Sequence, residues 1–251
     1  ALGVEGRLLG DSITAYSLVD YDTYFDKLNI FYLFSSWQMR EGTVASLTLD
    51  RRYTPGLSLS NALYSLGADD FSDFDPALSN SELRRLAEDR SRIYRSAYAS
   101  LTQQLDNRWQ LLVDGGVSSL RDESDQADIS GMDSDDWYVY GQLMGSGLFR
   151  SGDLYSLGLR YTDAENSDIS SVILRARAPV GDRLQLNPRL RMDFRRGDDV
   201  DDQRRLIPSL FSTYRLTKRT SLELDLGLEF SRTELGMGGN QDDRFFSLRA
   251  G

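Results

Sequence analysis

Hydrophobic and polar residues alternate with a period of two along much of the second half of the chain. From Ser221 to Ser231, Leu or Phe fills every even-numbered position, and Glu, Asp or Gly fills the odd-numbered positions between them. Similar runs begin at Leu154, Ser171 and Arg183. A helix would distribute these leucines around its whole circumference, whereas a strand sends successive side chains to opposite faces. The pattern therefore predicts strands that have one apolar and one polar face.

Twelve strands fit this pattern, and the connections between them alternate in length. The strands are expected at 4–19, 25–39, 43–54, 91–105, 108–121, 136–149, 154–163, 168–179, 183–196, 204–216, 220–232 and 243–251. Short turns such as Gly181-Asp182 alternate with longer, mostly acidic connections, of which 55–90 is the longest. Outer-membrane barrels show this alternation. The chain is therefore expected to be all-β: one domain over 1–251 that forms a transmembrane antiparallel up-and-down β-barrel of about 12 strands.

A soluble β-sandwich is the alternative interpretation of the same pattern. A soluble sheet buries its apolar face and wets its polar face, where lysine is well tolerated. The polar positions of this chain instead carry Arg, Asp, Glu, Gln, Ser and Gly, a mixture that suits a crowded lumen. No run of about 18 apolar residues occurs, so a transmembrane helix is excluded. Contact with lipid explains how so many leucines share one face, and the outer membrane of a Gram-negative bacterium is the expected location.

Composition excludes many kinds of chemistry. The chain contains no cysteine and no histidine, which rules out thiolate metal sites, cysteine nucleophiles and histidine-based triads. Its net charge of −10 argues against a nucleic-acid partner. Glu223 and Glu229 on one strand would lie about 20 Å apart, too far for a glycosidase carboxylate pair. From the sequence, we expect neither enzymatic activity nor a metal or cofactor.

Charged residues on the polar faces are the strongest candidates for a functional site. The expected lumen-lining set is Arg160, Arg175, Arg177, Arg189, Arg191, Arg195, Arg215, Glu223, Asp225 and Glu229. Unpaired charges in a confined lumen cost several kcal/mol each, so these groups must pair, hydrate or bind something. Two interpretations follow. The charges form an ion-pair lattice that makes the barrel rigid, or they create a transverse field that orients and conducts a polar or anionic solute.

The longest connection is expected to contain a short helix. Ser79 and Glu82 have the spacing of a capping box, in which each residue satisfies a backbone N–H of the other. Leu83 and Leu86 follow on one face of the predicted helix. This helix is a candidate plug for the barrel mouth, and simple ordering of a long loop is the alternative.

The alternating strands over nearly the whole chain resemble the outer-membrane β-barrels of Gram-negative bacteria. The segments 55–63 (PGLSLSNAL) and 78–90 (LSNSELRRLAEDR) are similar to the C-terminal barrels of export proteins that carry periplasmic tetratricopeptide repeats. This resemblance implies a periplasmic segment upstream or a periplasmic protein partner, besides contact with outer-membrane lipid. The chain stops in mid-alternation at Ser247-Leu-Arg-Ala-Gly251, so we expect that a few further residues follow.

A pore or translocation conduit for export of a polysaccharide or polypeptide is the function expected from these features. The alternative is a plugged barrel that anchors a periplasmic or surface partner-binding assembly. A third interpretation is an autotransporter-like barrel threaded by an upstream segment. No sequence motif decides between them.

Overall fold

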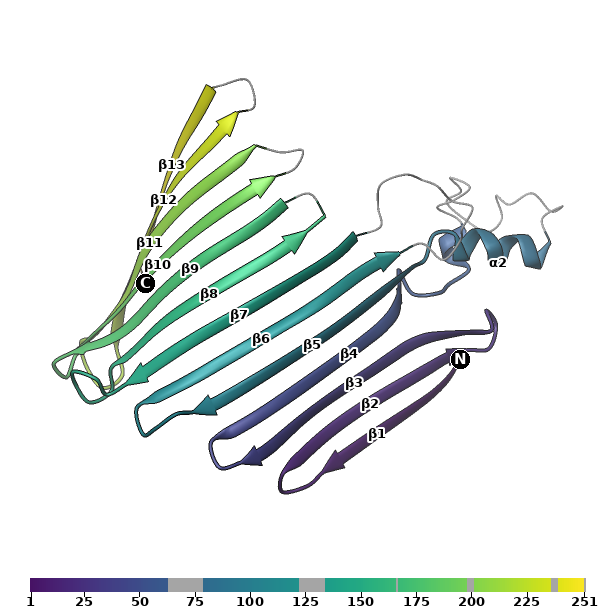
Figure 1. Ribbon diagram of the computed structural model, residues 1–251, viewed down its shortest axis with the longest axis horizontal. Coiled ribbons are helices and arrows are strands. Elements are labelled where there is room, and N and C mark those ends of the chain that lie inside the picture. Colours follow the sequence, from purple (N-terminus) through teal and green to yellow (C-terminus); the bar gives the residue numbers. More distant parts are fainter. Residues whose placement is uncertain (63–78, 122–133, 166, 198–200, 236–238, 251) are drawn as a thin grey trace. The chain divides into compact units, whose positions relative to one another are not determined.

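The computed structural model describes residues 1–62, 79–121, 134–165, 167–197, 201–235 and 239–250. Within these residues, thirteen strands form one sheet in which each strand pairs with its neighbours in the chain, from β1 to β13 (Figure 1). The predicted all-β fold with up-and-down antiparallel strands is therefore confirmed. No helix in the described part of the chain is long and apolar enough to cross a membrane.

Apart from the first predicted strand, the strands match the positions expected from the alternation to within a few residues. They are β1 (Leu2–Leu9), β2 (Ile13–Asp22), β3 (Lys27–Arg40), β4 (Thr43–Thr54), β5 (Arg92–Gln104), β6 (Trp109–Arg121), β7 (Ser134–Ser146), β8 (Leu154–Ala164), β9 (Ser167–Val180), β10 (Leu184–Gly197), β11 (Asp202–Arg215), β12 (Ser221–Leu235) and β13 (Gly239–Ala250). Helix α2 (Asn80–Glu88) lies between β4 and β5. Residues 63–78 of the predicted long connection, and 122–133 of the acidic one, lie outside the described residues.

The first predicted strand is wrong, because 4–19 divides into β1 and β2. A turn at residues 10–12 separates the two strands, and the Gly10 N–H donates to the Ile13 carbonyl at 2.8 Å. Gly, Asp and Ser are common turn residues, and they occupy these three positions. Leu8 and Leu9 occupy successive positions, so apolar residues occur on both faces of this stretch and the alternation is too weak to show the break. The residues that the structure describes therefore contain thirteen strands instead of the predicted twelve.

The described chain divides into two compact units. The first comprises residues 1–100 and 116–137, and the second comprises residues 101–115 and 138–251. In the first unit, Phe25, Ala62 and Ala87 form a small buried cluster, and Leu83 and Leu86 of α2 pack against it. This cluster fixes α2 beside the β2–β3 turn, which contains Phe25.

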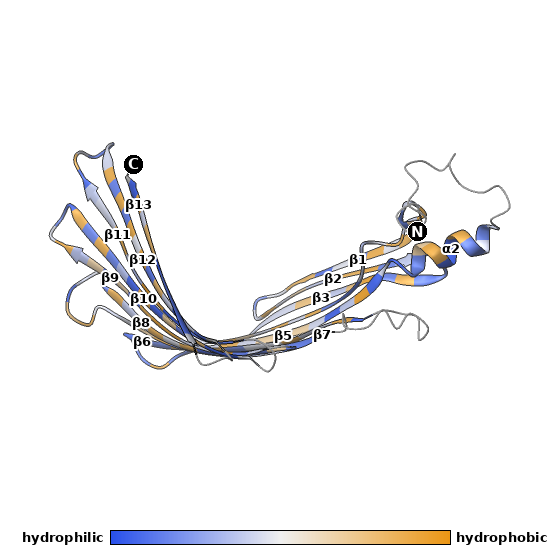
Figure 2. Ribbon diagram, turned by 90° about the horizontal axis from the view of Figure 1, so that it is seen from above, coloured by the Kyte–Doolittle hydropathy of each residue, from blue (hydrophilic) through white to orange (hydrophobic). Residues whose placement is uncertain are grey.

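In the second unit, the register places apolar and polar side chains on opposite faces of the sheet. Leu157, Leu174 and Leu190 are direct cross-strand neighbours on β8, β9 and β10. Figure 2 shows the resulting alternation of hydrophobic and hydrophilic residues along these strands. The apolar face is open: Leu159 is 56% exposed and Phe246 is 66% exposed. A contiguous apolar surface of this kind needs lipid or a partner to cover it, because water does not solvate it well.

The β7–β8 turn contains a carboxylate whose removal is expected to make stability less dependent on pH. Asp153 is only 3% exposed, and its side chain accepts hydrogen bonds from the N–H groups of Leu148, Phe149 and Arg150 at 2.9, 2.9 and 2.8 Å. Burial alone would raise the pKa of Asp153, but the backbone donors outweigh it and hold this pKa below its usual value. The ionised carboxylate therefore stabilises the fold above the unfolded-state pKa, and this contribution is lost as the pH falls through the folded-state pKa.

We expect Asp153→Asn to lower the urea midpoint of the folded protein in detergent micelles near neutral pH. The difference from wild type should shrink as the pH falls below about 4, where the unfolded aspartate also becomes protonated. Asp182→Asn is the matched control, because Asp182 is an exposed carboxylate in the next turn of the same kind. Equal midpoints for wild type and Asp153→Asn at neutral pH would contradict the assigned role of Asp153.

Candidate functional site

All ten charged residues predicted to line a lumen lie in the second unit, on one face of β8–β12. Cross-strand neighbours in an antiparallel sheet point to the same side, and the register of β8 to β12 joins these residues through such neighbours. We call this surface the polar face. Within it, the structure separates a paired cluster around Asp193, Arg205 and Glu229 from Arg175, Arg177 and Arg189, which lie nearer the opposite ends of β9 and β10.

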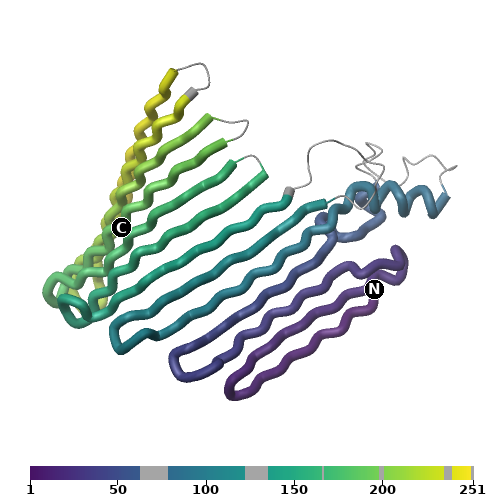
Figure 3. Tube along the Cα trace, in the orientation of Figure 1, coloured from purple at the N-terminus to yellow at the C-terminus, as the bar shows by residue number. Residues whose placement is uncertain are grey.

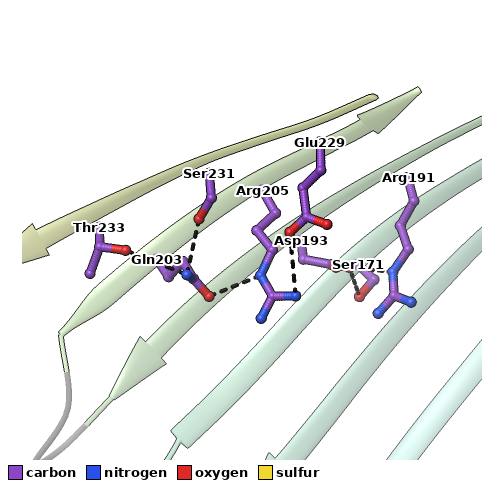
Figure 4. A network of polar contacts seen from close by, with 8 residues as sticks. All are labelled: Ser171, Arg191, Asp193, Gln203, Arg205, Glu229, Ser231 and Thr233. Carbon is purple, nitrogen blue, oxygen red and sulfur yellow. Dashed lines mark hydrogen bonds and ion pairs between the residues drawn. The ribbon is translucent and has the colours of Figure 1, made fainter. Parts of the chain in front are cut away.

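Asp193 is the centre of the paired cluster (Figure 4). It is 6% exposed and accepts a hydrogen bond from Ser171 Oγ at 2.7 Å, across the register of β9 and β10. Arg191 Nε donates to the same carboxylate oxygen, Asp193 Oδ1, at 2.8 Å. Of these three residues, only Arg191 belongs to the predicted set. The buried carboxylate therefore has both a neutral and a charged donor.

Arg205 continues the paired cluster on β11. Its Nε donates to Gln203 Oε1 at 2.9 Å, and its Nη1 lies 3.9 Å from Glu229 Oε1 on β12. Gln203 Nε2 in turn donates to Ser231 Oγ at 3.0 Å and to Thr233 Oγ1 at 3.4 Å. Among these, only Glu229 was predicted. Its ion pair supports the lattice interpretation for this end of the polar face.

Arg175 and Arg189 have a different environment. They are direct cross-strand neighbours on β9 and β10, and both are exposed. Among the described residues, no carboxylate forms an ion pair with Arg175, Arg177 or Arg189. Like charges placed directly opposite each other destabilise a sheet. The flanking positions hold small residues, Ser156 on β8 and Ser209 on β11, which leave the guanidinium groups accessible.

The predicted carboxylates on β12 lie apart from these arginines. Asp225 pairs in register with Phe211, and Glu223 pairs with Thr213, so neither lies opposite an arginine of β11. Three strand spacings separate β9 from β12, which is about 14 Å along the sheet. The polar face therefore has cationic β9 and β10 on one side and anionic β12 on the other.

The remaining predicted arginines make individual contacts. Arg160 Nε donates to Thr162 Oγ1 at 3.1 Å, and its guanidinium lies 4.8 Å from the ring centroid of Tyr138. Arg195 Nε is buried and has no hydrogen-bond partner within the part of the chain that the structure describes. Arg215 is the last residue of β11, at the 216–220 turn. These arginines extend the positive charge along the strands but do not join the paired cluster.

The helix predicted in the long connection is present, and so is its capping box. Ser79 N–H donates to Glu82 Oε2 at 2.8 Å, and Glu82 N–H donates to Ser79 Oγ at 3.3 Å. The hydrogen bonds from the Ser79 backbone and side chain lower the pKa of Glu82. At the other end of α2, Lys27 Nζ lies 3.0 Å from Glu88 Oε2. The helix is thus tied to the β2–β3 turn within the first unit, and its role as a plug stays a prediction.

Comparison with known proteins gives a likeness of fold only. No protein-family model matches the sequence, and no curated protein matches it. The structure is similar to that of OmpT (in-vitro folded), an outer membrane protein of Vibrio cholerae, with a TM-score of 0.43 and 12% sequence identity. The match covers 99% of this chain and 87% of that chain.

One functional expectation is corrected at this point. The likeness to OmpT does not support the prediction that the chain lacks enzymatic activity, and we withdraw that prediction. The sequence argument was too broad, because it excluded chemistry based on histidine or cysteine and one carboxylate pair on β12. It did not consider groups brought together from several strands, such as Asp193, Arg205 and Glu229.

Proposed function

We propose that this chain forms a β-barrel in the outer membrane of a Gram-negative bacterium, with the polar face of β8–β12 lining a conduit. The open leucine face supports contact with lipid, since neighbouring strands present exposed apolar side chains there. If the sheet closes into a barrel, the polar face would surround the lumen, and its charged side chains would line the route of a solute. The solute that we assign to this conduit is an acidic polysaccharide or polypeptide in export, supplied by a periplasmic partner or an upstream domain.

The observation that carries this proposal is the accessible pair of Arg175 and Arg189. A lattice built only for rigidity would place carboxylates beside these arginines, as it does beside Arg191 and Arg205. An arginine pair without a carboxylate stabilises a passing anion through charge-assisted hydrogen bonds. The carboxylates of β12 on the other side of the polar face would orient a solute that carries both charges.

A plugged barrel that anchors a partner-binding assembly is the second candidate. It is favoured by the paired cluster around Asp193, in which side chains of β9 contact those of β10 and side chains of β11 contact those of β12 (Figure 4). It is also favoured by α2, which is capped and docked beside the strand ends.

Conductance across a planar lipid bilayer separates the two candidates. For a conduit, we expect steady openings of the purified full chain after insertion. Deletion of residues 79–90 should leave these openings unchanged or enlarge them. A wild type that inserts but stays silent contradicts the conduit and supports the anchor, and openings that appear only after the deletion identify α2 as the plug.

A further inference from the structure

Three arginines interrupt the apolar face of the second unit. Arg204, Arg232 and Arg244 come from β11, β12 and β13. Arg204 and Arg232 are direct cross-strand neighbours, and Arg244 pairs with Phe230, two residues along β12 from Arg232. Their positions in the register place them on the side of the leucines, opposite Asp193 and Arg205.

These arginines border a shallow apolar cavity of about 360 Å³. Its apolar lining comes from Met192, Phe194, Leu206 and Phe230. Phe194 is 48% exposed and Phe230 is 40% exposed, so the aromatic rings are not covered by the rest of the chain. The cavity therefore combines an uncovered apolar floor with a charged border, in which arginines outnumber the two carboxylates of Asp242 and Asp243.

The charges at this border are only partly neutralised. Arg204 Nη2 lies 3.4 Å from Glu234 Oε1, which leaves the other guanidinium nitrogens for a ligand. With its oxygen turned toward Arg232, the Asn240 amide accepts a hydrogen bond from Nη2 at 2.6 Å. Asp242 is the register neighbour of Arg232 but forms no ion pair with it among the described residues. Arg232 thus has a neutral acceptor and no carboxylate partner.

Arg204 and Arg232 lie near the ends of their strands, where a strand that crosses a membrane would reach the level of the head groups. Arg204 is two residues from the start of β11, and Arg232 is three residues from the end of β12. Arginine on the lipid face of a barrel is costly at the bilayer centre and tolerated near the interface. There, the paired guanidinium groups would meet phosphate, which binds arginine with two parallel hydrogen bonds.

We propose that Arg204, Arg232 and Arg244 bind the phosphate of a membrane lipid, whose acyl chains lie over Phe194, Leu206 and Phe230. The head group is expected to be anionic, because the opposed arginines repel each other unless an anion lies between them. The anion is expected to belong to a lipid, because the exposed apolar side chains beside the arginines would be covered by acyl chains. This inference rests on the membrane insertion in the proposed function, and it does not depend on whether the lumen conducts.

Lipid binding to the purified full chain in detergent micelles tests the site, with native mass spectrometry as the readout. Phosphatidic acid, which carries a phosphate monoester, is the probe, and phosphatidylcholine is the comparison lipid. We expect Arg232→Gln and Arg244→Gln each to weaken phosphatidic acid binding about tenfold, the loss of one charge-assisted contact. Asp242→Asn should strengthen binding, because it removes the negative charge beside Arg232.

Arg249→Gln is the matched control, since Arg249 lies on the same strand as Arg244 but on the polar face. An equal loss of binding in this variant would show general charge attraction and overturn the site. Inorganic phosphate that binds as tightly as phosphatidic acid would overturn the assignment to a lipid. If the chain inserts and conducts but binds phosphatidic acid and phosphatidylcholine equally well, the lipid site is refuted and the proposed function is not. A chain that stays monomeric in water without detergent refutes the proposed function as well.

Discussion

Replacing Arg175 and Arg189 together by glutamine is expected to weaken strongly the anion preference of the proposed conduit. Each arginine contributes about 1 kcal/mol of attraction to an anion 4 Å away even at the dielectric constant of water, and more in a confined lumen. Loss of both charges should therefore change the ratio of anion to cation permeability about tenfold or more. The carboxylates Glu223 and Asp225 would then offset more of the positive charge that remains on the polar face, which shifts the selectivity toward cations.

Reversal potentials in a salt gradient across a planar bilayer measure this ratio directly. Arg219→Gln is the control, because Arg219 lies in the 216–220 turn and outside the polar face of the strands. If Arg175→Gln/Arg189→Gln conducts with the selectivity of wild type, these arginines do not line the path. If Arg219→Gln changes the selectivity equally, the effect comes from net charge and not from the position of the pair.

Local sequence signals were enough to predict most strands and the helix. The contacts between side chains on different strands could not be predicted, because they depend on the cross-strand register. The period of two assigned residues such as Arg189 and Glu223 to the polar side, because this assignment needs only one strand. The capping box of Ser79 and Glu82 could also be predicted, because both of its residues lie within one short segment. Which arginine lies opposite which carboxylate depends on how the strands align, and a single sequence does not contain that alignment.

The central residue of the paired cluster illustrates this limit. Asp193 occupies a polar position in an arginine-rich run of β10, and nothing in that run distinguishes it from an exposed carboxylate. Its importance comes from Ser171, which lies opposite it on β9, and from Arg191 two residues along β10. Arg205 was missed for the same reason, since its contact with Glu229 joins two strands.

The two arginine environments imply a division of roles within one face. At the paired cluster, the carboxylates of Asp193 and Glu229 already pair with neighbouring cations, so a solute in the proposed conduit would gain little there. At Arg175 and Arg189, the cations keep their capacity to bind. Rigid pairing near one end of the strands therefore supports the register that holds the accessible pair in position nearer the other end.

Removing the buried carboxylate should be the most destabilising single change on the polar face. Asp193→Ala leaves the Ser171 hydroxyl and the Arg191 guanidinium without their acceptor. A buried hydrogen-bonding group left without a partner costs about 1–3 kcal/mol. The guanidinium is 39% exposed and recovers part of its solvation, which keeps the expected loss of unfolding free energy within this range.

Asp225→Ala provides the matched comparison, because Asp225 is an exposed carboxylate of the same face and forms no ion pair among the described residues. Its effect should stay within about 0.5 kcal/mol in reversible urea unfolding. Combining Asp193→Ala with Arg191→Gln should recover part of the loss, because the uncompensated cation is then absent. Additive effects of the two substitutions would show that Asp193 acts through Ser171 and packing alone, and the ion pair with Arg191 would have no role in holding the register.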